Sequence, residues 1–124
     1  MTERARLWAR SGLVWLLLGM AAGMQIGLAG EYGQSSHHAH MGLLGGLWAV
    51  VFAFLFDKRG SELTLGGKLQ WALYNLGVVV MAVSMFMVVR QGGTWGMYIG
   101  MGGIAVIVAT LWIVLDVWPR GPAA

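Results

Sequence analysis

The chain has 124 residues, of which 58% are hydrophobic and 10% are charged, and its formal net charge is +3. A water-soluble domain carries roughly 25% charged residues, and so short a chain cannot bury this much apolar surface in one core. The composition therefore excludes an ordinary soluble fold and predicts an integral membrane protein surrounded by lipid. With no cysteine, disulfides, iron–sulfur clusters, thiolate metal sites and covalent c-type haem are excluded.

The basic residues lie in short clusters beside apolar segments and not along one helix face, so the positive charge does not indicate nucleic-acid binding. The first cluster, Arg4, Arg6 and Arg10, precedes an apolar run from Leu13 to Leu28. That run is longer than the roughly 7–15 apolar residues of a signal peptide. We therefore interpret it as a transmembrane helix and not as a cleaved leader.

Four segments approach the roughly 20 residues that a helix needs to cross the hydrocarbon core. They predict an all-α chain, a single four-helix transmembrane domain over residues 1–124 with helices at about 8–29, 36–56, 69–89 and 95–118. The second segment is apolar only from Met41 onward, so it spans comfortably only if the preceding histidine stretch is also helical. The histidines then occupy the first turn of this helix, near one membrane face.

The Lys and Arg residues predict the orientation, because they are enriched in cytoplasmic loops. Seven of the eight lie before the first helix, between the second and third helices, or after the fourth: Arg4, Arg6, Arg10, Lys58, Arg59, Lys68 and Arg120. Only Arg90 lies on the other side. Both termini are therefore expected in the cytoplasm, and the histidine loop is expected on the periplasmic side of a cell inner membrane.

Glycine and methionine are both frequent, with 20 and nine residues. Our first interpretation of the glycines is close helix packing in lipid, and the alternative is clearance for a flat, bulky ligand. Methionines four residues apart, such as Met20 and Met24, are interpreted as lipid-facing or packing residues. The alternative is a set of thioether ligands for a soft metal, formed by Met20, Met24, Met41, Met81, Met85, Met97 and Met101.

The three histidines of the chain, His37, His38 and His40, lie at the expected start of the second helix. Ionisable groups at membrane depth are costly, and they therefore indicate function. At about 100° per residue, His38 and His40 point to nearly opposite faces of the helix. Such a pair does not easily chelate one ion, but it suits one imidazole ligand for each of two sites on either side of the helix.

The stretch His38-Ala39-His40, with Gly46 six residues after the second histidine, resembles the His-x-His motif of heme–copper oxidase catalytic subunits. In that superfamily the two histidines bind two different haems near the outer membrane surface, and twelve helices form three arcs of four. The resemblance covers about ten residues in sequence, together with the topology of the chain. It implies that the chain is similar to one arc and that a homotrimer would rebuild the whole.

The resemblance implies a b-type haem held by His38 of one protomer and His40 of the next, with Arg90 beside a propionate. His37 has no counterpart in the motif and remains open as a surface residue, a copper ligand or a group that supports a haem ligand. The second helix lacks the tyrosine that oxidases place beside their copper site, and Tyr74 is expected to pack between helices. An oxygen-reducing enzyme is therefore not predicted, and whether any catalysis occurs is open; electron transfer with a quinone or another redox partner is expected.

Two further classes of function remain for the same residues. One is binding or transport of a divalent or cuprous metal ion by the histidines, with methionine support, and the other is an accessory membrane subunit without a cofactor. Three histidines in a short loop also fit a polar interfacial segment. Among the other polar residues, Asn75 is expected to hydrogen-bond between helices, Gln70 to meet headgroups and Glu31 to be solvated or to support an imidazole.

Overall fold

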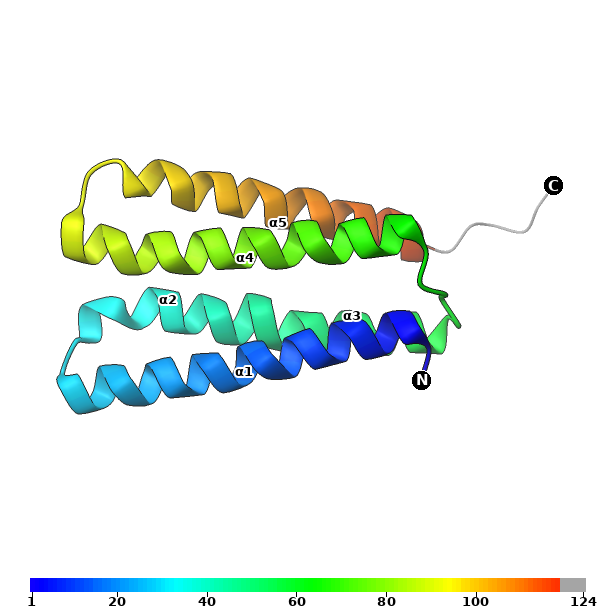
Figure 1. The fold of residues 1–124 in the computed structure, drawn as a ribbon, viewed down its shortest axis with the longest axis horizontal. Helices are drawn as coiled ribbons and strands as arrows, with labels where there is room; N and C mark the ends of the chain where they lie inside the picture. The colour runs from blue at the N-terminus through cyan, green and yellow to red at the C-terminus, as the bar shows by residue number, and fades with distance from the viewer. Residues whose placement is uncertain (119–124) are drawn as a thin grey trace.

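Four apolar rods run antiparallel along one axis in the computed structural model, which describes residues 1–118 (Figure 1). Each rod is 23 to 27 residues long and apolar enough to cross a membrane. The prediction of an all-helical chain with four candidate membrane spans is therefore confirmed. Arg120, one of the cations used to predict the orientation, lies outside the described residues.

The first rod is helix α1 (Glu3–Ala29). The second rod is continuous but changes its geometry along its length, as 3₁₀-helix η1 (Tyr32–Gln34), α2 (Ser35–His40), π-helix η2 (Met41–Trp48) and α3 (Ala49–Lys58). The third and fourth rods are α4 (Leu65–Gln91) and α5 (Trp95–Val117). We call the end that holds residues 30–40 the histidine end, and the end that holds Thr2 the N-terminal end.

Helices α1 and α4 begin several residues before their predicted starts, because a threonine caps each of them. The Thr2 hydroxyl oxygen accepts a hydrogen bond from the backbone N–H of Ala5, and the Thr64 hydroxyl oxygen accepts one from Gly67 at 3.1 Å. These bonds satisfy backbone donors that the first turn of a helix otherwise leaves unpaired. The extra turns bring Arg4 and the start of α4 inside the helical part of the molecule.

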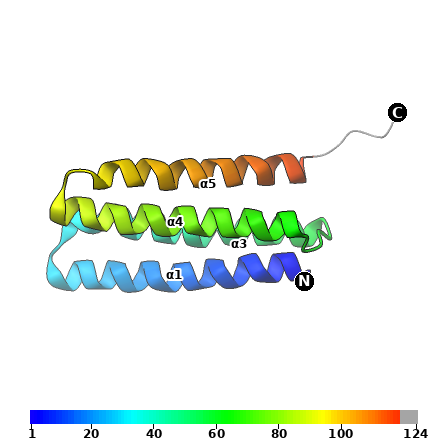
Figure 2. The same ribbon diagram turned by 45° about the horizontal axis from the view of Figure 1, so that its top comes forward.

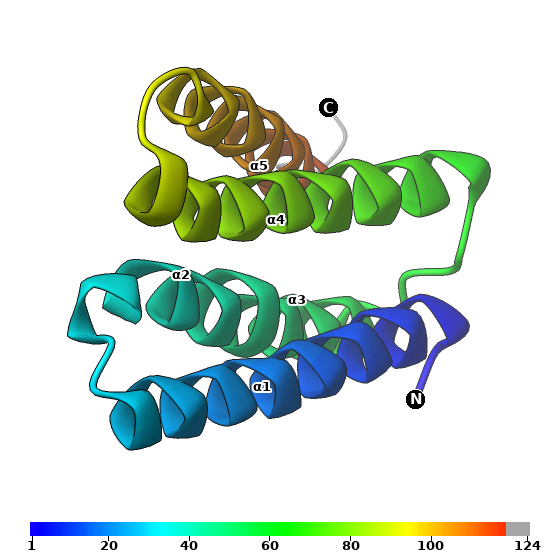
Figure 3. The same cartoon turned by 60° about the vertical axis from the view of Figure 1, so that its left-hand side comes forward.

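The rods are stacked in chain order, with α1 and α5 at the two outer edges (Figures 1 and 3). Helix α1 packs along η2 and α3, and helix α4 contacts α2. Helix α5 packs chiefly on α4, beside which it runs in Figure 2. Much of α5 is left without a protein neighbour: Ile104, Ile107, Leu111 and Leu115 are each more than half exposed. In a bilayer these side chains meet lipid, which is as apolar as they are.

Glycines set the closest helix contacts. A Cβ placed on Gly12 of α1 would lie 3.0 Å from the carbonyl oxygen of Gly46, and one placed on Gly102 of α5 would lie 2.8 Å from that of Gly77. At these positions only glycine allows the backbones to approach so closely. Gly12 and Gly102 are therefore packing residues, as the sequence predicted. Gly100 is not, because no other atom lies within 4 Å of the position that its Cβ would take.

The π-helix η2 is eight residues long, and π geometry is rare and usually confined to single turns. Its Gly45 and Gly46 lie against the side chains of Trp15 and Leu16 on α1, and a Cβ on Gly45 would lie 2.6 Å from the Trp15 ring. The Tyr74 hydroxyl of α4 donates a hydrogen bond to the Leu44 carbonyl oxygen at 2.6 Å. Tyr74 therefore has the packing role that its mid-helix position predicted.

An aromatic cluster fills the space between α1, α3 and α4. The ring centroid of Trp8, which is fully buried, lies 5.5 Å from that of Phe52, 5.8 Å from that of Phe56 and 5.2 Å from that of Tyr74. Farther along α1, the indole N–H of Trp15 donates to the Asn75 side-chain oxygen of α4 at 2.8 Å. The prediction that Asn75 forms an interhelical hydrogen bond is thus confirmed.

The contact between α4 and α5 can be tested with two alanine substitutions on one helix. Gly102→Ala places a methyl carbon 2.8 Å from the Gly77 carbonyl oxygen and from the Met81 nitrogen. We expect it to destabilise the fold by about 1–3 kcal/mol, the usual cost of overpacking. Gly100→Ala adds its methyl group to open space and is expected to stabilise α5 by about 0.5–1 kcal/mol. Unfolding by SDS in mixed micelles, followed by circular dichroism, measures both, and equal effects would contradict the close contact.

Candidate functional site

His38 is fixed against α1 by a backbone carbonyl group. Its Nδ1 atom lies 2.6 Å from the Gly19 carbonyl oxygen, and its ring occupies the space beside Gly23, where a Cβ would lie 2.6 Å from Cε1. A carbonyl oxygen only accepts hydrogen bonds, so Nδ1 must carry the proton. In the neutral form of this ring the lone pair is then on Nε2, which is an atom that binds metal ions in proteins.

His40 has the same arrangement, with a partner on its own helix. Its Nδ1 atom lies 2.7 Å from the Ser36 carbonyl oxygen, in an exposed hydrogen bond. The same reasoning assigns the proton to Nδ1 and the lone pair to Nε2. The helical geometry of α2 places His40 nearly opposite His38, which lies against α1, so the two imidazoles face different surroundings.

His37 points toward α4 and differs from both. It is 8% exposed, its ring packs edge-on against Phe86 at 5.4 Å between centroids, and its Nδ1 atom has no hydrogen-bond partner. With Trp15 and Met41 it lines an apolar crevice of about 230 Å³. Within residues 1–118, no three His, Asp or Glu side chains gather into a metal centre. The possible role of His37 as a copper ligand stays a prediction.

Arg90 pairs with Glu31 across the histidine end. Its guanidinium donates to Glu31 Oε2 at 3.1 Å and lies over the Phe86 ring, 4.4 Å from the centroid. Both partners of this ion pair are about half exposed. Glu31 is therefore engaged by Arg90 and not by an imidazole. The pairing of Arg90 with a haem propionate stays a prediction, and it would require the propionate to compete with Glu31.

The Nδ1 contacts of His38 and His40 are of the kind that histidines make when Nε2 binds a metal ion. Ligating histidines almost always donate their second ring N–H to a carbonyl or carboxylate, which fixes the tautomer and the ring orientation. No protein-family model matches this chain, and neither a curated protein nor a solved structure matches it. The two imidazoles face apart, with His38 against α1, so one chain does not bring both rings to a single ion.

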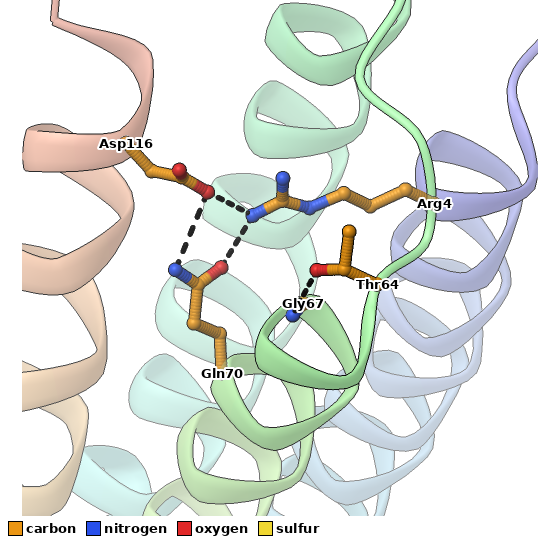
Figure 4. Close-up of polar contacts among 5 residues, drawn as sticks. All are labelled: Arg4, Thr64, Gly67, Gln70 and Asp116. Atoms are coloured by element: carbon orange, nitrogen blue, oxygen red, sulfur yellow. Dashed lines mark hydrogen bonds and ion pairs between the residues drawn. The ribbon is translucent and has the colours of Figure 1, made fainter.

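A second polar cluster lies at the N-terminal end and was missed in the sequence (Figure 4). Arg4 donates from one guanidinium nitrogen to the Gln70 side-chain oxygen and to Asp116 Oδ2, the latter at 2.6 Å. Its guanidinium also lies 3.9 Å from the ring centroid of Phe56. Arg4 is 5% exposed and Gln70 is 1% exposed, so the prediction that Gln70 meets headgroups is wrong.

The sequence contained one signal for this cluster. Thr2 followed by Glu3 is a typical helix N-terminus, with a capping hydroxyl and an acidic first turn. This N-terminal pattern places Arg4 inside α1 and not in a flanking loop. The partners of Arg4 could not be found this way, because Asp116 is 112 residues away and their contact depends on how the helices pack.

The importance of this cluster can be tested by removing its carboxylate. Asp116→Ala leaves the guanidinium of Arg4 buried without its anion, and since Asp116 is partly exposed we expect a loss of about 1–3 kcal/mol of stability. Asp57→Ala removes a carboxylate at the same end that contacts the exposed N-terminal ammonium at 3.7 Å. We expect that control to cost less than about 1 kcal/mol. Unfolding in SDS mixed micelles gives both values, and an equal or larger loss for Asp57→Ala would contradict the role of the cluster.

Proposed function

We propose that this chain is a b-type haem-binding integral membrane protein with an electron-transfer role. The observation that carries the proposal is the backbone carbonyl oxygen that lies within hydrogen-bond distance of Nδ1 in both His38 and His40. Both rings donate Nδ1–H to a backbone carbonyl oxygen, at 2.6 Å and 2.7 Å, and both therefore hold a free lone pair on Nε2. His37, whose Nδ1 has no partner, lacks this arrangement.

The opposed directions of the two rings favour a site between protomers. His38 of one copy and His40 of the next would bind the two sides of one haem, and a closed ring of three copies would form three equivalent sites. A haem with two imidazole ligands supplies a one-electron iron couple without an open coordination position. In this proposal the chain positions the two ligands through the carbonyl oxygens of Gly19 and Ser36.

The Lys and Arg distribution supports an orientation with both termini in the cytoplasm and the histidine end on the periplasmic side of the inner membrane. Arg90 is the cation at the histidine end that can neutralise a propionate, if it exchanges Glu31 for that group. A quinone, which dissolves in the same lipid, is the proposed class of redox partner.

One observation favours a second candidate, the binding of a soft metal ion. His37 and Met41 lie four residues apart, hence on one helix face, and line the same apolar crevice. Imidazole and thioether groups both bind Cu(I). In this case the purified protein would contain copper without haem, and His37→Ala would remove it.

The haem proposal is tested by visible spectra of the detergent-purified protein, oxidised and then reduced with dithionite. We expect a Soret band and the sharp reduced bands of a six-coordinate b-type haem. His38→Ala and His40→Ala should each lose this spectrum, whereas His37→Ala should retain it because that ring faces Phe86. A wild-type protein without a Soret band, after expression with added haem, would refute the proposal.

Co-expression of the His38→Ala and His40→Ala chains tests whether the haem lies between protomers. A chain with His38→Ala still has His40, and a chain with His40→Ala still has His38, so mixed trimers rebuild complete interfaces. Random assembly at equal expression should restore about a quarter of the sites. Two ligands within one chain would give no restoration, and single-mutant preparations mixed after purification are the matched control.

A further inference from the structure

Helix α1 has one continuous face that no other part of the described chain covers. Its exposed residues recur at spacings of four and three, which place them on one side of a helix. From the N-terminal end toward the histidine end they are Arg6, Arg10, Leu13, Leu17, Met20 and Met24. The four apolar members are each more than half exposed. The face is therefore cationic over its first two positions and apolar along the rest of the span.

Arg6 and Arg10 also line a shared crevice of about 230 Å³, together with Glu3, Leu7 and Leu63. Within residues 1–118 neither arginine forms an ion pair with a carboxylate. Arg6 donates only to the backbone carbonyl oxygen of Met1, at 3.2 Å. Arg4 is different, because it points into the molecule and pairs with Asp116. The crevice thus presents two unpaired guanidinium groups to the outside.

Because the apolar part of α1 is long enough to cross a bilayer, we expect Arg6 and Arg10, at its N-terminal end, to lie at the level of the headgroups. Arg10 precedes the exposed apolar residue Leu13 by three positions, roughly 5 Å along the helix axis. Arg6 lies one further turn toward the N-terminal end. A phosphate held here would be continuous with acyl chains lying along Leu13 and Leu17.

We propose that this face of α1 binds an anionic phospholipid with a glycerol headgroup, such as phosphatidylglycerol. Arg6 and Arg10 donate hydrogen bonds to the phosphate oxygens, which guanidinium groups bind well. The Glu3 carboxylate at the rim accepts hydrogen bonds from the glycerol hydroxyl groups. The two arginines and one glutamate sum to a charge of +1, which a headgroup of charge −1 balances and a zwitterionic headgroup does not.

Native mass spectrometry of the protein in detergent micelles tests this site, because binding is then independent of orientation in a bilayer. The protein is titrated with phosphatidylglycerol and, separately, with phosphatidylcholine of the same acyl chains. We expect wild type to prefer phosphatidylglycerol, and the double variant R6Q/R10Q to lose about fivefold or more of that preference. R6K/R10K keeps both charges and is expected to retain most of it.

The matched control is K58Q/R59Q, which removes two cations at the same end of the molecule, where α3 ends and outside the crevice. It is expected to leave the preference unchanged. An equal loss in R6Q/R10Q and K58Q/R59Q would show attraction by net charge alone and would overturn the site. Oligomers that carry no phosphatidylglycerol would also overturn it, since a second copy would then cover this face. Circular dichroism of each variant checks that the helices remain folded.

Discussion

The buried guanidinium of Arg4 is the contact on which the arrangement of the four rods depends. It extends from α1 to Gln70 on α4 and Asp116 on α5, and it lies over the Phe56 ring of α3. A charge removed from water is costly unless it is paired and hydrogen-bonded, so packings that separate these helices leave Arg4 without its partners. One side chain thereby selects the arrangement that brings all four rods together at the N-terminal end.

The same constraint explains why α5 stays in place at an edge of the structure. Its contact with α4 relies on the close approach of Gly77 and Gly102, and most of its outer side chains are exposed. In lipid, apolar surface gives no driving force for helix association, so close backbone packing and polar contacts have to provide it. Asp116 supplies the polar contact, and it joins α5 to α1 as well as to α4.

The sequence was sufficient for features that depend on local pattern. Apolar length predicted the four spans, and helical periodicity predicted that His38 and His40 face apart. Features that depend on neighbours from other helices were not predictable. Arg4 was counted only as a cytoplasmic cation, and the tautomer of His38 depends on a Gly19 carbonyl oxygen from α1. The π geometry of η2 has only the Gly45-Gly46 pair as a local sign, because the side chains that fill the space beside these glycines, Trp15 and Leu16, belong to α1.

The two ends of the molecule therefore differ in how their polar groups are satisfied. At the N-terminal end, Arg4 and Gln70 are buried and bonded to each other within one chain, while the Nε atom of Arg4 has no hydrogen-bond partner. At the histidine end, the bond of His40 is exposed, the Arg90–Glu31 pair is half exposed, and the ring nitrogens Nε2 of His38 and His40 remain free to accept a further partner. Exposed polar groups of this kind can be covered by a ligand or by a second copy of the chain. Arg4 and its partners hold the four helices together at the N-terminal end. The histidine end is where a ligand or a second copy can add binding energy.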